Sequence, residues 1–492
     1  MKVHASLSSL MVILLLISMV LPGCGNPVPA ETTAVDETVA VPDTTAAEVV
    51  ISTTPSVSEE ITLRVLADSP SAMPDLSMMT KLISKIARTV EANYDGLEVQ
   101  VEYLPTDDVQ RATMLEAIRG EIAAGVGPDA FLFSRSQPSP LPFAAESIVP
   151  EPLFPDVVTA MNVGYFADLS EYYNGDTRLR KDGFASGVME AGVIGDVRYV
   201  LPLRYNFPVA YVDMEKFADT GLSTDIFSSG GNMLLRTLVE NEVQICVETG
   251  KDPLRSMVCS LLPDPLTAED LTDYMTRYQV LLPTLDAATY TTDLSTVIAF
   301  QDSKADMYWG NDEFSSVCIQ IGTLENAVEQ SILAQISGIE LGMFPITNPD
   351  GTLIADVNCY GAVNANCGYP EVAYAFISAF LTEDAQWEKN ITTNGVSFNS
   401  EMMADGYPVL TNGSAEAIFA ILNCQPDNSE IQVAVDALEI NDEDVPILHL
   451  EVEARFPTWA ERDLENKLKD LLDTPVEELP GIAQAWLQIQ QS

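Results

Sequence analysis

The order of apolar and polar positions predicts a β-α-β-α-β unit in the first third of the chain. Three short runs are rich in apolar and β-branched residues or alternate between apolar and polar side chains, as strands do: residues 61–67, 97–104 and 130–133. Between them, apolar residues recur at helical spacing in residues 75–93 and in the stripe Leu115, Ile118 and Ile122. Strands that alternate with helices imply a parallel sheet with helices on its faces.

The carboxyl ends of these predicted strands indicate where a ligand would bind, because ligands of parallel α/β sheets lie outside those ends. The ends fall near Asp68, near Pro105 and at Ser134-Arg135-Ser136-Gln137. The polar side chains of these segments are therefore candidates for contacts with a ligand.

Residues 198–213 form an extended stretch. Pro202 and Pro208 exclude a helix interior because proline lacks the backbone N–H, and the aromatic and β-branched residues around them favour strands. At about 3.3 Å per residue the stretch spans roughly 50 Å, enough to run from one domain into another. We interpret it as a crossover, or hinge, of a two-lobed binding protein. A buried strand with an edge proline is the alternative.

Residues 1–60 are expected to lie outside the folded body. The apolar run of residues 10–21 is too short to span a bilayer and is typical of a secretory signal. It ends in Leu21-Pro22-Gly23-Cys24, which resembles a bacterial lipoprotein box, in which the cysteine is lipidated and becomes the new N-terminus. A plain secretory signal with a chance cysteine is the alternative. Residues 25–60 contain no Lys, Arg or aromatic residue, which predicts a disordered tether.

The net charge restricts the expected partners. The chain of 492 residues has 24 Lys and Arg against 73 Asp and Glu, a formal net charge of −49. Such a charge repels nucleic acid and anionic lipid, so neutral or cationic partners are expected. A solvated acidic surface with no role in ligand binding would explain the same net charge. The length exceeds what one hydrophobic core supports, which predicts two or more domains.

Residues that carry catalytic chemistry are scarce. The chain has 2 histidines, His4 and His449, and no nucleophile-elbow, zinc-protease or phosphate-loop motif. Carboxylates are too numerous for a glycosidase pair to be identified. No Cys-x-x-Cys occurs, so metal or thioredoxin-like chemistry is not supported. We expect no enzyme activity, no cofactor and no metal. Six cysteines besides Cys24 could form disulfides or remain free thiols: Cys246, Cys259, Cys318, Cys359, Cys367 and Cys424.

Several short motifs follow one another from about residue 60 to about residue 400. They are Ile61-Thr-Leu-Arg-Val-Leu66, residues 121–133, Phe166-Ala-Asp-Leu-Ser-Glu-Tyr-Tyr173, residues 198–202, residues 300–309, Gly342-Met-Phe-Pro345, Gly361-Ala-Val-Asn-Ala-Asn366, the helical stretch 371–381 and Asn394-Gly-Val-Ser-Phe-Asn399. In content and order they resemble the extracellular solute-binding proteins of ABC importers, the family that includes maltose-type sugar-binding lipoproteins. Ser303, where the family usually has glycine, and residues 230–262 depart from its pattern.

The resemblance implies a two-lobed periplasmic-binding-protein-like α/β fold of type II, with each lobe a mostly parallel sheet flanked by helices. Three hinge crossings would fall near residues 203–207, 347–354 and 395–398. The implied divisions are a lipoprotein signal peptide at 1–24, a disordered tether at 25–60, a first lobe of 61–204 plus 352–395 and a second lobe of 205–351 plus 396–492. Apolar stripes in residues 459–472 and 482–489 predict helices that pack on the second lobe.

The resemblance also places the ligand contacts. A sugar offers hydroxyls to planar polar side chains and a C–H face to aromatic rings. By family position the contacts are Asp68, Ser134, Arg135 and Gln137 from the first lobe, Tyr205, Asn206 and Tyr360 from the hinges, and Trp309, Asn311 and Asp312 from the second lobe. Trp309 is the expected stacking residue. Asp129, which follows Gly-Pro, is expected to fix a turn instead.

The function implied by the resemblance is that of a substrate-binding protein anchored through Cys24 to the extracellular face of the cell membrane. It would capture a small solute, a sugar or oligosaccharide, between its lobes and deliver it to an ABC permease. Contact with the membrane would be through the lipid only, and no nucleic acid is expected as a partner. A ligand-sensing partner of a membrane signalling protein and a tethered polysaccharide hydrolase are the alternatives.

The lipoprotein box predicts the effect of one substitution. Cys24→Ser removes the only thiol of the box, so we expect the variant to leave the membrane fraction while its ligand affinity stays unchanged. Fractionation followed by immunoblotting measures this, with Cys424→Ser as the control that keeps the box intact. Retention of the Cys24→Ser variant in the membrane fraction after a high-salt wash would contradict a lipid anchor.

Overall fold

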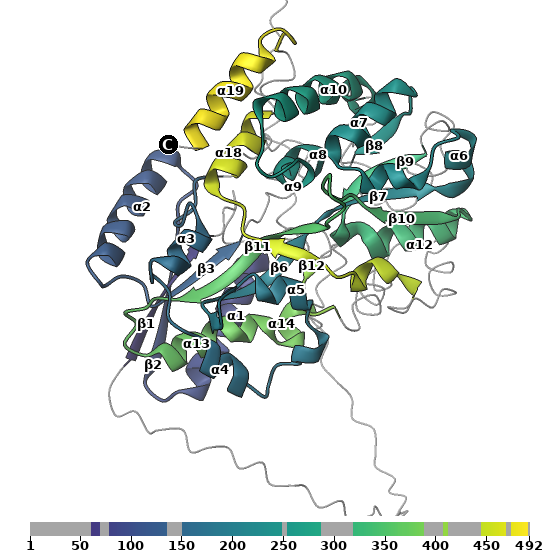
Figure 1. The fold of residues 1–492 in the computed structure, drawn as a ribbon. Helices are drawn as coiled ribbons and strands as arrows, with labels where there is room; N and C mark the ends of the chain where they lie inside the picture. Colours follow the sequence, from purple (N-terminus) through teal and green to yellow (C-terminus); the bar gives the residue numbers. More distant parts are fainter. Residues whose placement is uncertain are drawn as a thin grey trace, which may run out of the picture. The chain divides into compact units, whose positions relative to one another are not determined.

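The structure is a computed structural model that describes residues 61–68, 78–134, 150–247, 253–286, 318–387, 407–411, 444–468 and 474–490 (Figure 1). All of these residues belong to one compact unit, Pro55–Ser492. Within this unit the strands form two main sheets, each with its own cluster of buried apolar side chains.

The larger sheet has the strand order β12-β6-β11-β3-β1-β2, and β13 pairs with β11. Its strands are β1 (Ile61–Asp68), β2 (Leu97–Tyr103), β3 (Ala130–Ser134), β6 (Val200–Asn206), β11 (Ile354–Val363), β12 (Tyr407–Pro408) and β13 (Glu453–Arg455). As predicted, β1 pairs in parallel with both β2 and β3. In contrast, β11 is antiparallel to both β3 and β6. The sheet is therefore mixed, because β6 leaves it for the second sheet while β11 returns in the opposite direction.

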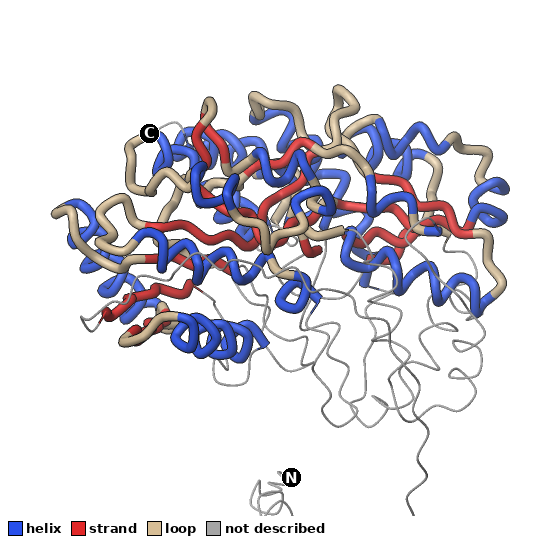
Figure 2. Tube along the Cα trace, turned by 90° about the horizontal axis from the view of Figure 1, so that it is seen from below, coloured by secondary structure: helices blue, strands red, loops and turns tan. Residues whose placement is uncertain are grey.

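Helices cover both faces of the larger sheet. They include α1 (Met78–Asn93), α2 (Asp108–Ala123), α3 (Val157–Asn162), α4 (Ser170–Gly175), α5 (Ser186–Glu190), α13 (Pro370–Ser378) and α14 (Glu383–Trp387). Asp107 caps α2, since its carboxylate accepts from the backbone N–H of Gln110 at 3.0 Å. Figure 2 shows the strands running between layers of helices.

The second sheet has the order β10-β7-β9-β8. Its strands are β7 (Pro208–Asp213), β8 (Ile245–Val247), β9 (Ile319–Thr323) and β10 (Leu341–Pro345), and its helices include α6 (Met214–Asp219), α7 (Gly231–Glu240), α8 (Pro253–Ser256), α9 (Val258–Leu261), α10 (Ala268–Asp286) and α12 (Ala327–Ser337). Two C-terminal helices, α18 (Trp459–Leu468) and α19 (Leu479–Gln490), place leucines in the buried cluster of this sheet. In this sheet β7 is antiparallel to both β9 and β10, and β8 is parallel to β9.

The chain crosses between the two sheets where the prolines and aromatic residues predicted a hinge. Strand β6 ends at Asn206 and β7 begins at Pro208, so Phe207 alone separates them. The chain returns between Pro345, the end of β10, and Ile354, the start of β11. The predicted two-lobed α/β fold class and its first two crossings are thus confirmed, and the third, at residues 395–398, lies outside the described residues. The second sheet departs from the expected mostly parallel arrangement, because among its described strands only β8 and β9 pair in parallel.

The lobe boundaries stay a prediction. Within residues 396–492, β12 and β13 pair in the larger sheet, whereas α18 and α19 pack in the core of the second. The C-terminal part of the chain therefore contacts both sheets, which becomes important for the candidate site.

Close packing of α5 against the segment before β13 predicts opposite effects of two glycine substitutions. A Cβ at Gly187 would overlap the carbonyl oxygen of Val452, whereas a Cβ at Gly120, within α2, would meet nothing within 4 Å. We expect Gly187→Ala to lower the free energy of unfolding by about 1–3 kcal/mol. Gly120→Ala, the control, should raise it by about 0.4–1 kcal/mol. Urea unfolding measures both, and equal effects would contradict the described packing.

Candidate ligand-binding site

A small pocket lies at the carboxyl end of β3, between the larger sheet and the first turn of α18. Its lining consists of five aromatic residues, three prolines, two valines and one arginine; the aromatic residues and the arginine are Phe133, Phe154, Tyr360, Phe456, Trp459 and Arg462. The cavity volume is about 20 Å³, room for about one water molecule. As described, the cavity has room for a small substituent of a solute. A whole sugar ring would fit only if the walls of the pocket moved apart.

Stacked aromatic rings form one wall of the pocket. Tyr360 of β11 stacks on Phe133 of β3, with ring centroids 5.1 Å apart and planes at 18°. Phe456 meets Tyr360 edge to face at 5.3 Å. These positions follow from the sheet register, which pairs Tyr360 with Phe133 on neighbouring strands. The burial of Tyr360 raises the pKa of its hydroxyl well above the usual range, so the ring stays neutral.

The opposite wall is the first turn of α18, which begins with a capping box. The hydroxyl of Thr458 accepts from the backbone N–H of Glu461 at 3.3 Å, and the Glu461 carboxylate accepts from the backbone N–H of Thr458 at 2.7 Å. This box fixes the turn that carries Trp459 and Arg462. Residues three positions apart lie on one side of a helix, so both side chains line the pocket.

Arg462 is a buried cation with spare hydrogen-bonding capacity. Its side chain is 6% exposed, its Nη2 donates to Oδ1 of Asn358 at 3.1 Å, and its Nη1 lies 3.7 Å from Oε2 of Glu465. Among the described residues Nη1 has no hydrogen-bond acceptor. A ligand oxygen at this nitrogen would supply one. Because Glu465 balances the charge, the pair favours a neutral oxygen over an anionic one.

Asp68, a predicted contact, is buried beside this pocket. It is 4% exposed, and one carboxylate oxygen accepts from Nη2 of Arg111 at 2.6 Å. Burial raises the pKa of Asp68, while the charge of Arg111 opposes the rise. The register pairs Asp68 with Phe133, so it shares a sheet face with Tyr360. The structure therefore brings Asp68 and Tyr360 together, with Asp68 in an ion pair.

The other described candidates lie elsewhere. Ser134 is fully buried and follows Phe133, so it points to the opposite face of the sheet. Tyr205 is buried at the crossing and packs edge to face on Tyr407, with centroids 6.2 Å apart. Asn206 donates through Nδ2 to Oε2 of Glu325 at 3.0 Å, a bond that joins the two sheets beside the hinge. These two residues hold the crossing together.

Several predicted positions lie outside the described residues and stay predictions. They are Arg135, Gln137, Trp309, Asn311, Asp312 and the lipidation residue Cys24. The turn role of Asp129 stays a prediction; its carboxylate accepts from the backbone N–H of Arg64 in β1 at 2.9 Å.

The sequence interpretation missed the residues of α18 that line the pocket. Residues 459–472 were predicted as a helix for packing only, yet Trp459 and Arg462 face the pocket from its first turn. A local signal was present. Phe456-Pro-Thr-Trp459 puts two aromatic residues beside a Thr-x-x-Glu capping box, which fixes where the helix starts.

Three further features of the described part of the chain concern metal ligands, cysteines and membrane helices. No group of three or more His, Cys, Asp or Glu residues there is placed to hold a metal ion. Four cysteines whose side chains are described are free thiols: Cys259, Cys318, Cys359 and Cys367. None of the described helices combines the length and the apolar character that crossing a membrane requires.

Comparison with known proteins gives remote structural neighbours. No family model and no curated protein sequence matches the chain. An extracellular solute-binding protein of family 1 from Alicyclobacillus acidocaldarius subsp. acidocaldarius DSM 446 is 15% identical, with 88% of this chain and 99% of that one covered and a TM-score of 0.47. A sugar transporter from Rhizobium etli, in an open conformation, is 13% identical, with coverage of 87% and 99% and a TM-score of 0.45.

A third neighbour is a cyclic alpha-maltosyl-1,6-maltose binding protein from Arthrobacter globiformis. It is 16% identical, with 87% of this chain and 98% of that one covered and a TM-score of 0.42. All three descriptions name solute-binding or sugar-related proteins.

The buried Asp68–Arg111 pair predicts a pH-dependent stability effect. Arg111→Met leaves the carboxylate without its counter-charge, so we expect a loss of about 3–5 kcal/mol of unfolding free energy near pH 7. Without Arg111 the pKa of Asp68 rises further, and the protonated acid needs no cation. The loss should therefore shrink as the pH falls toward about 5.

Urea unfolding at several pH values measures this difference from the wild type. Arg64→Met is the matched control, because the pairs of Arg64 with Glu102 and Glu121 are 3.6 and 3.4 Å long and partly exposed to solvent. It should cost no more than about 1 kcal/mol at any pH. A loss for Arg111→Met that does not change with pH would contradict the burial of a charged Asp68.

Proposed function

We propose that this chain is the substrate-binding protein of an ABC importer, anchored to the extracellular face of the membrane through a lipid on Cys24. It captures a sugar or oligosaccharide between its two sheets and delivers it to the permease. The observation that carries the proposal is the pocket lined by Trp459, Tyr360 and Arg462, whose Nη1 has no hydrogen-bond acceptor among the described residues.

The chemistry of this pocket suits a carbohydrate. Aromatic rings offer flat apolar faces to the C–H groups of a sugar. Arg462 offers a planar polar group to hydroxyl oxygens, and the side chain of Asn358 holds it in place by accepting from its Nη2. A purely apolar ligand would leave the Nη1 donor without an acceptor, at a cost of about 1–3 kcal/mol or more.

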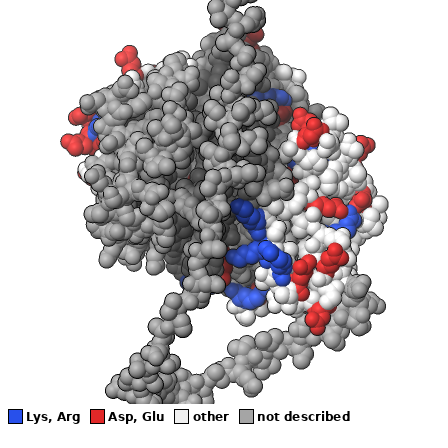
Figure 3. All heavy atoms as spheres, turned by 180° about the vertical axis from the view of Figure 1, so that it is seen from behind, with Lys and Arg blue, Asp and Glu red and all other residues white. Residues whose placement is uncertain are grey.

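The charge of the pocket supports a neutral solute. On the described part of the surface seen in Figure 3, Asp and Glu lie in several separate places and Lys and Arg gather mainly in one area. The formal net charge of −49 disfavours anions in solution. The ion pair with Glu465 offsets the charge of Arg462, so the pocket lining presents no uncompensated cation to overcome that repulsion. Neutral sugars fit both conditions.

Capture between the two sheets agrees with the crossings. Phe207 and residues 346–353 are the described links between the sheets, which suits a hinge motion of one sheet against the other. The small volume of the pocket fits a site whose walls separate to admit a ring.

A thermal-shift screen tests the proposal. The panel contains malto-, manno-, xylo- and chito-oligosaccharides, with amino acids and short peptides as other solute classes. A sugar at 100 times its Kd adds about 2.7 kcal/mol to the free energy of unfolding, so the melting temperature rises. Stabilisation by an amino acid or peptide and by no sugar would contradict a carbohydrate ligand.

Trp459→Ala then tests the pocket with the sugar that the screen identifies. Loss of the ring should weaken binding by about 1–3 kcal/mol, with little change in melting temperature. Trp486→Ala is the matched control, because Trp486 is a partly buried tryptophan of α19 that packs on the second core. It should lower the melting temperature and leave the affinity unchanged. Unaltered sugar affinity of Trp459→Ala would remove this pocket from the site.

A further inference from the structure

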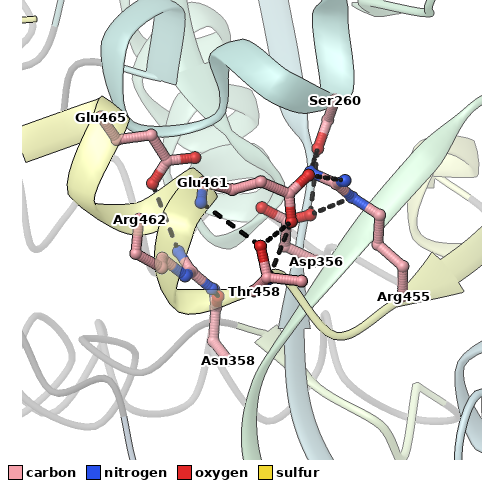
Figure 4. A network of polar contacts seen from close by, with 8 residues as sticks. All are labelled: Ser260, Asp356, Asn358, Arg455, Thr458, Glu461, Arg462 and Glu465. Atoms are coloured by element: carbon pink, nitrogen blue, oxygen red, sulfur yellow. Dashed lines mark hydrogen bonds and ion pairs between the residues drawn. The ribbon is translucent and has the colours of Figure 1, made fainter. Parts of the chain in front are cut away.

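Behind the pocket, four polar residues from four separate elements form one connected group (Figure 4). We call Ser260, Asp356, Arg455 and Glu461 the Arg455 cluster. Asp356 is fully buried on β11, and Arg455 lies on β13, which pairs in parallel with β11 at this position. Ser260 comes from α9 and Glu461 from α18.

Arg455 is the hub of this cluster. Its Nε donates to Oδ1 of Asp356 at 3.1 Å, its Nη1 to Oε1 of Glu461 at 2.5 Å and its Nη2 to Oγ of Ser260 at 3.2 Å. The hydroxyl of Ser260 in turn donates to Oδ1 of Asp356 at 2.9 Å. Burial alone would lower the pKa of Arg455, but Asp356 and Glu461 outweigh it and raise the pKa, so the cation is permanent.

The cluster joins the two sheets beside the hinge. Asp356 and Arg455 belong to the larger sheet, and Asp356 pairs with Asn206, the last residue before the crossing. The neighbours of Ser260 on α9 and the leucines of α18 are buried in the core of the second sheet. A change in the arrangement of the two sheets therefore changes the distances within this cluster.

The same cluster holds the wall of the pocket. One oxygen of Glu461 accepts from Arg455, while the other accepts from the backbone N–H of Thr458 and closes the capping box of α18. Trp459 and Arg462 lie on either side of Glu461 in that turn. The carboxylate of Glu461 thus connects the cation between the sheets to the two α18 side chains that line the pocket.

We infer that the Arg455 cluster couples the pocket to the arrangement of the two sheets, with Ser260 and Glu461 as positioning residues. Separation of the sheets weakens the Ser260 bonds, frees Arg455 and shifts the turn that carries Trp459 and Arg462. By linkage, a solute that fixes this turn stabilises the cluster and with it the closed arrangement. This inference rests on the proposed function for the meaning of the pocket, but its test needs no sugar.

Two variants each remove one connection of the cluster. Ser260→Ala removes the hydroxyl that ties α9 to Asp356 and Arg455, and Ser260→Thr keeps a hydroxyl there as the conservative rescue. Glu461→Gln removes the charge that faces Arg455, while glutamine still completes a capping box. Glu240→Gln is the control, since Glu240 pairs with Arg236 on the exposed surface of α7. Circular dichroism verifies that each variant is folded.

Two readouts are taken on the full chain without solute. Double electron–electron resonance measures the distance between two spin labels. Each label is attached to p-acetylphenylalanine, which replaces Val109 of α2 and Val280 of α10; these residues are 75% and 55% exposed. Fluorine NMR of protein labelled with 5-fluorotryptophan follows Trp459, whose resonance is assigned by its loss in Trp459→Phe. The resonance of Trp486 serves as the internal reference.

We expect Ser260→Ala and Glu461→Gln each to broaden the distance distribution and to move the Trp459 resonance by more than its line width. Ser260→Thr and Glu240→Gln should match the wild type in both readouts. A change in distance with an unmoved Trp459 resonance, a moved resonance with an unchanged distance, or no change in either would each overturn the coupling. If no sugar stabilises the protein in the thermal-shift screen, the proposed function is rejected, whereas the coupling between the cluster and the pocket is unaffected.

Discussion

The ion pair of the buried Asp356 with the partly exposed Arg455 is the constraint on which the candidate site depends. Asp356 is completely buried on the strand that re-enters the larger sheet, so it needs a cation in place. Removal of one partner from such a pair costs about 3–5 kcal/mol, because the remaining charge stays buried. The pairing of Arg455 with Asp356 holds β13 beside β11. As a result, α18 begins where Trp459 and Arg462 line the same pocket as Phe133 and Tyr360.

The directions of the strands explain why the pocket forms at this place. The strands β1, β3 and β6 all run toward the crossing, and β11 and β13 run away from it. Strand β3 ends at Ser134, opposite Cys359, and β13 occupies the adjoining part of the same edge of β11. The aromatic residues at this junction therefore come from segments that are more than 300 positions apart in the sequence.

Local patterns were sufficient to predict most of the fold that positions the site. The alternation of strands and helices predicted the parallel pairing of β1 with β2 and β3, and Pro202 and Pro208 indicated the crossing at Phe207. The site was harder to predict from the sequence than the fold. Asp68 is a polar residue at a strand end, as predicted, but its burial against Arg111 depends on how α2 packs. Arg462 acquires its role only through Asn358 and Tyr360, which no local pattern connects to it.

The central claim is that a sugar binds between the larger sheet and the first turn of α18. Hydrogen–deuterium exchange with and without the sugar identified by the screen tests it most directly. The account predicts slower exchange in β11 and in the turn that contains Trp459 and Arg462, with no change in α10, which packs in the second core away from the pocket lining. Unchanged exchange in β11 and α18 under saturating sugar would contradict it.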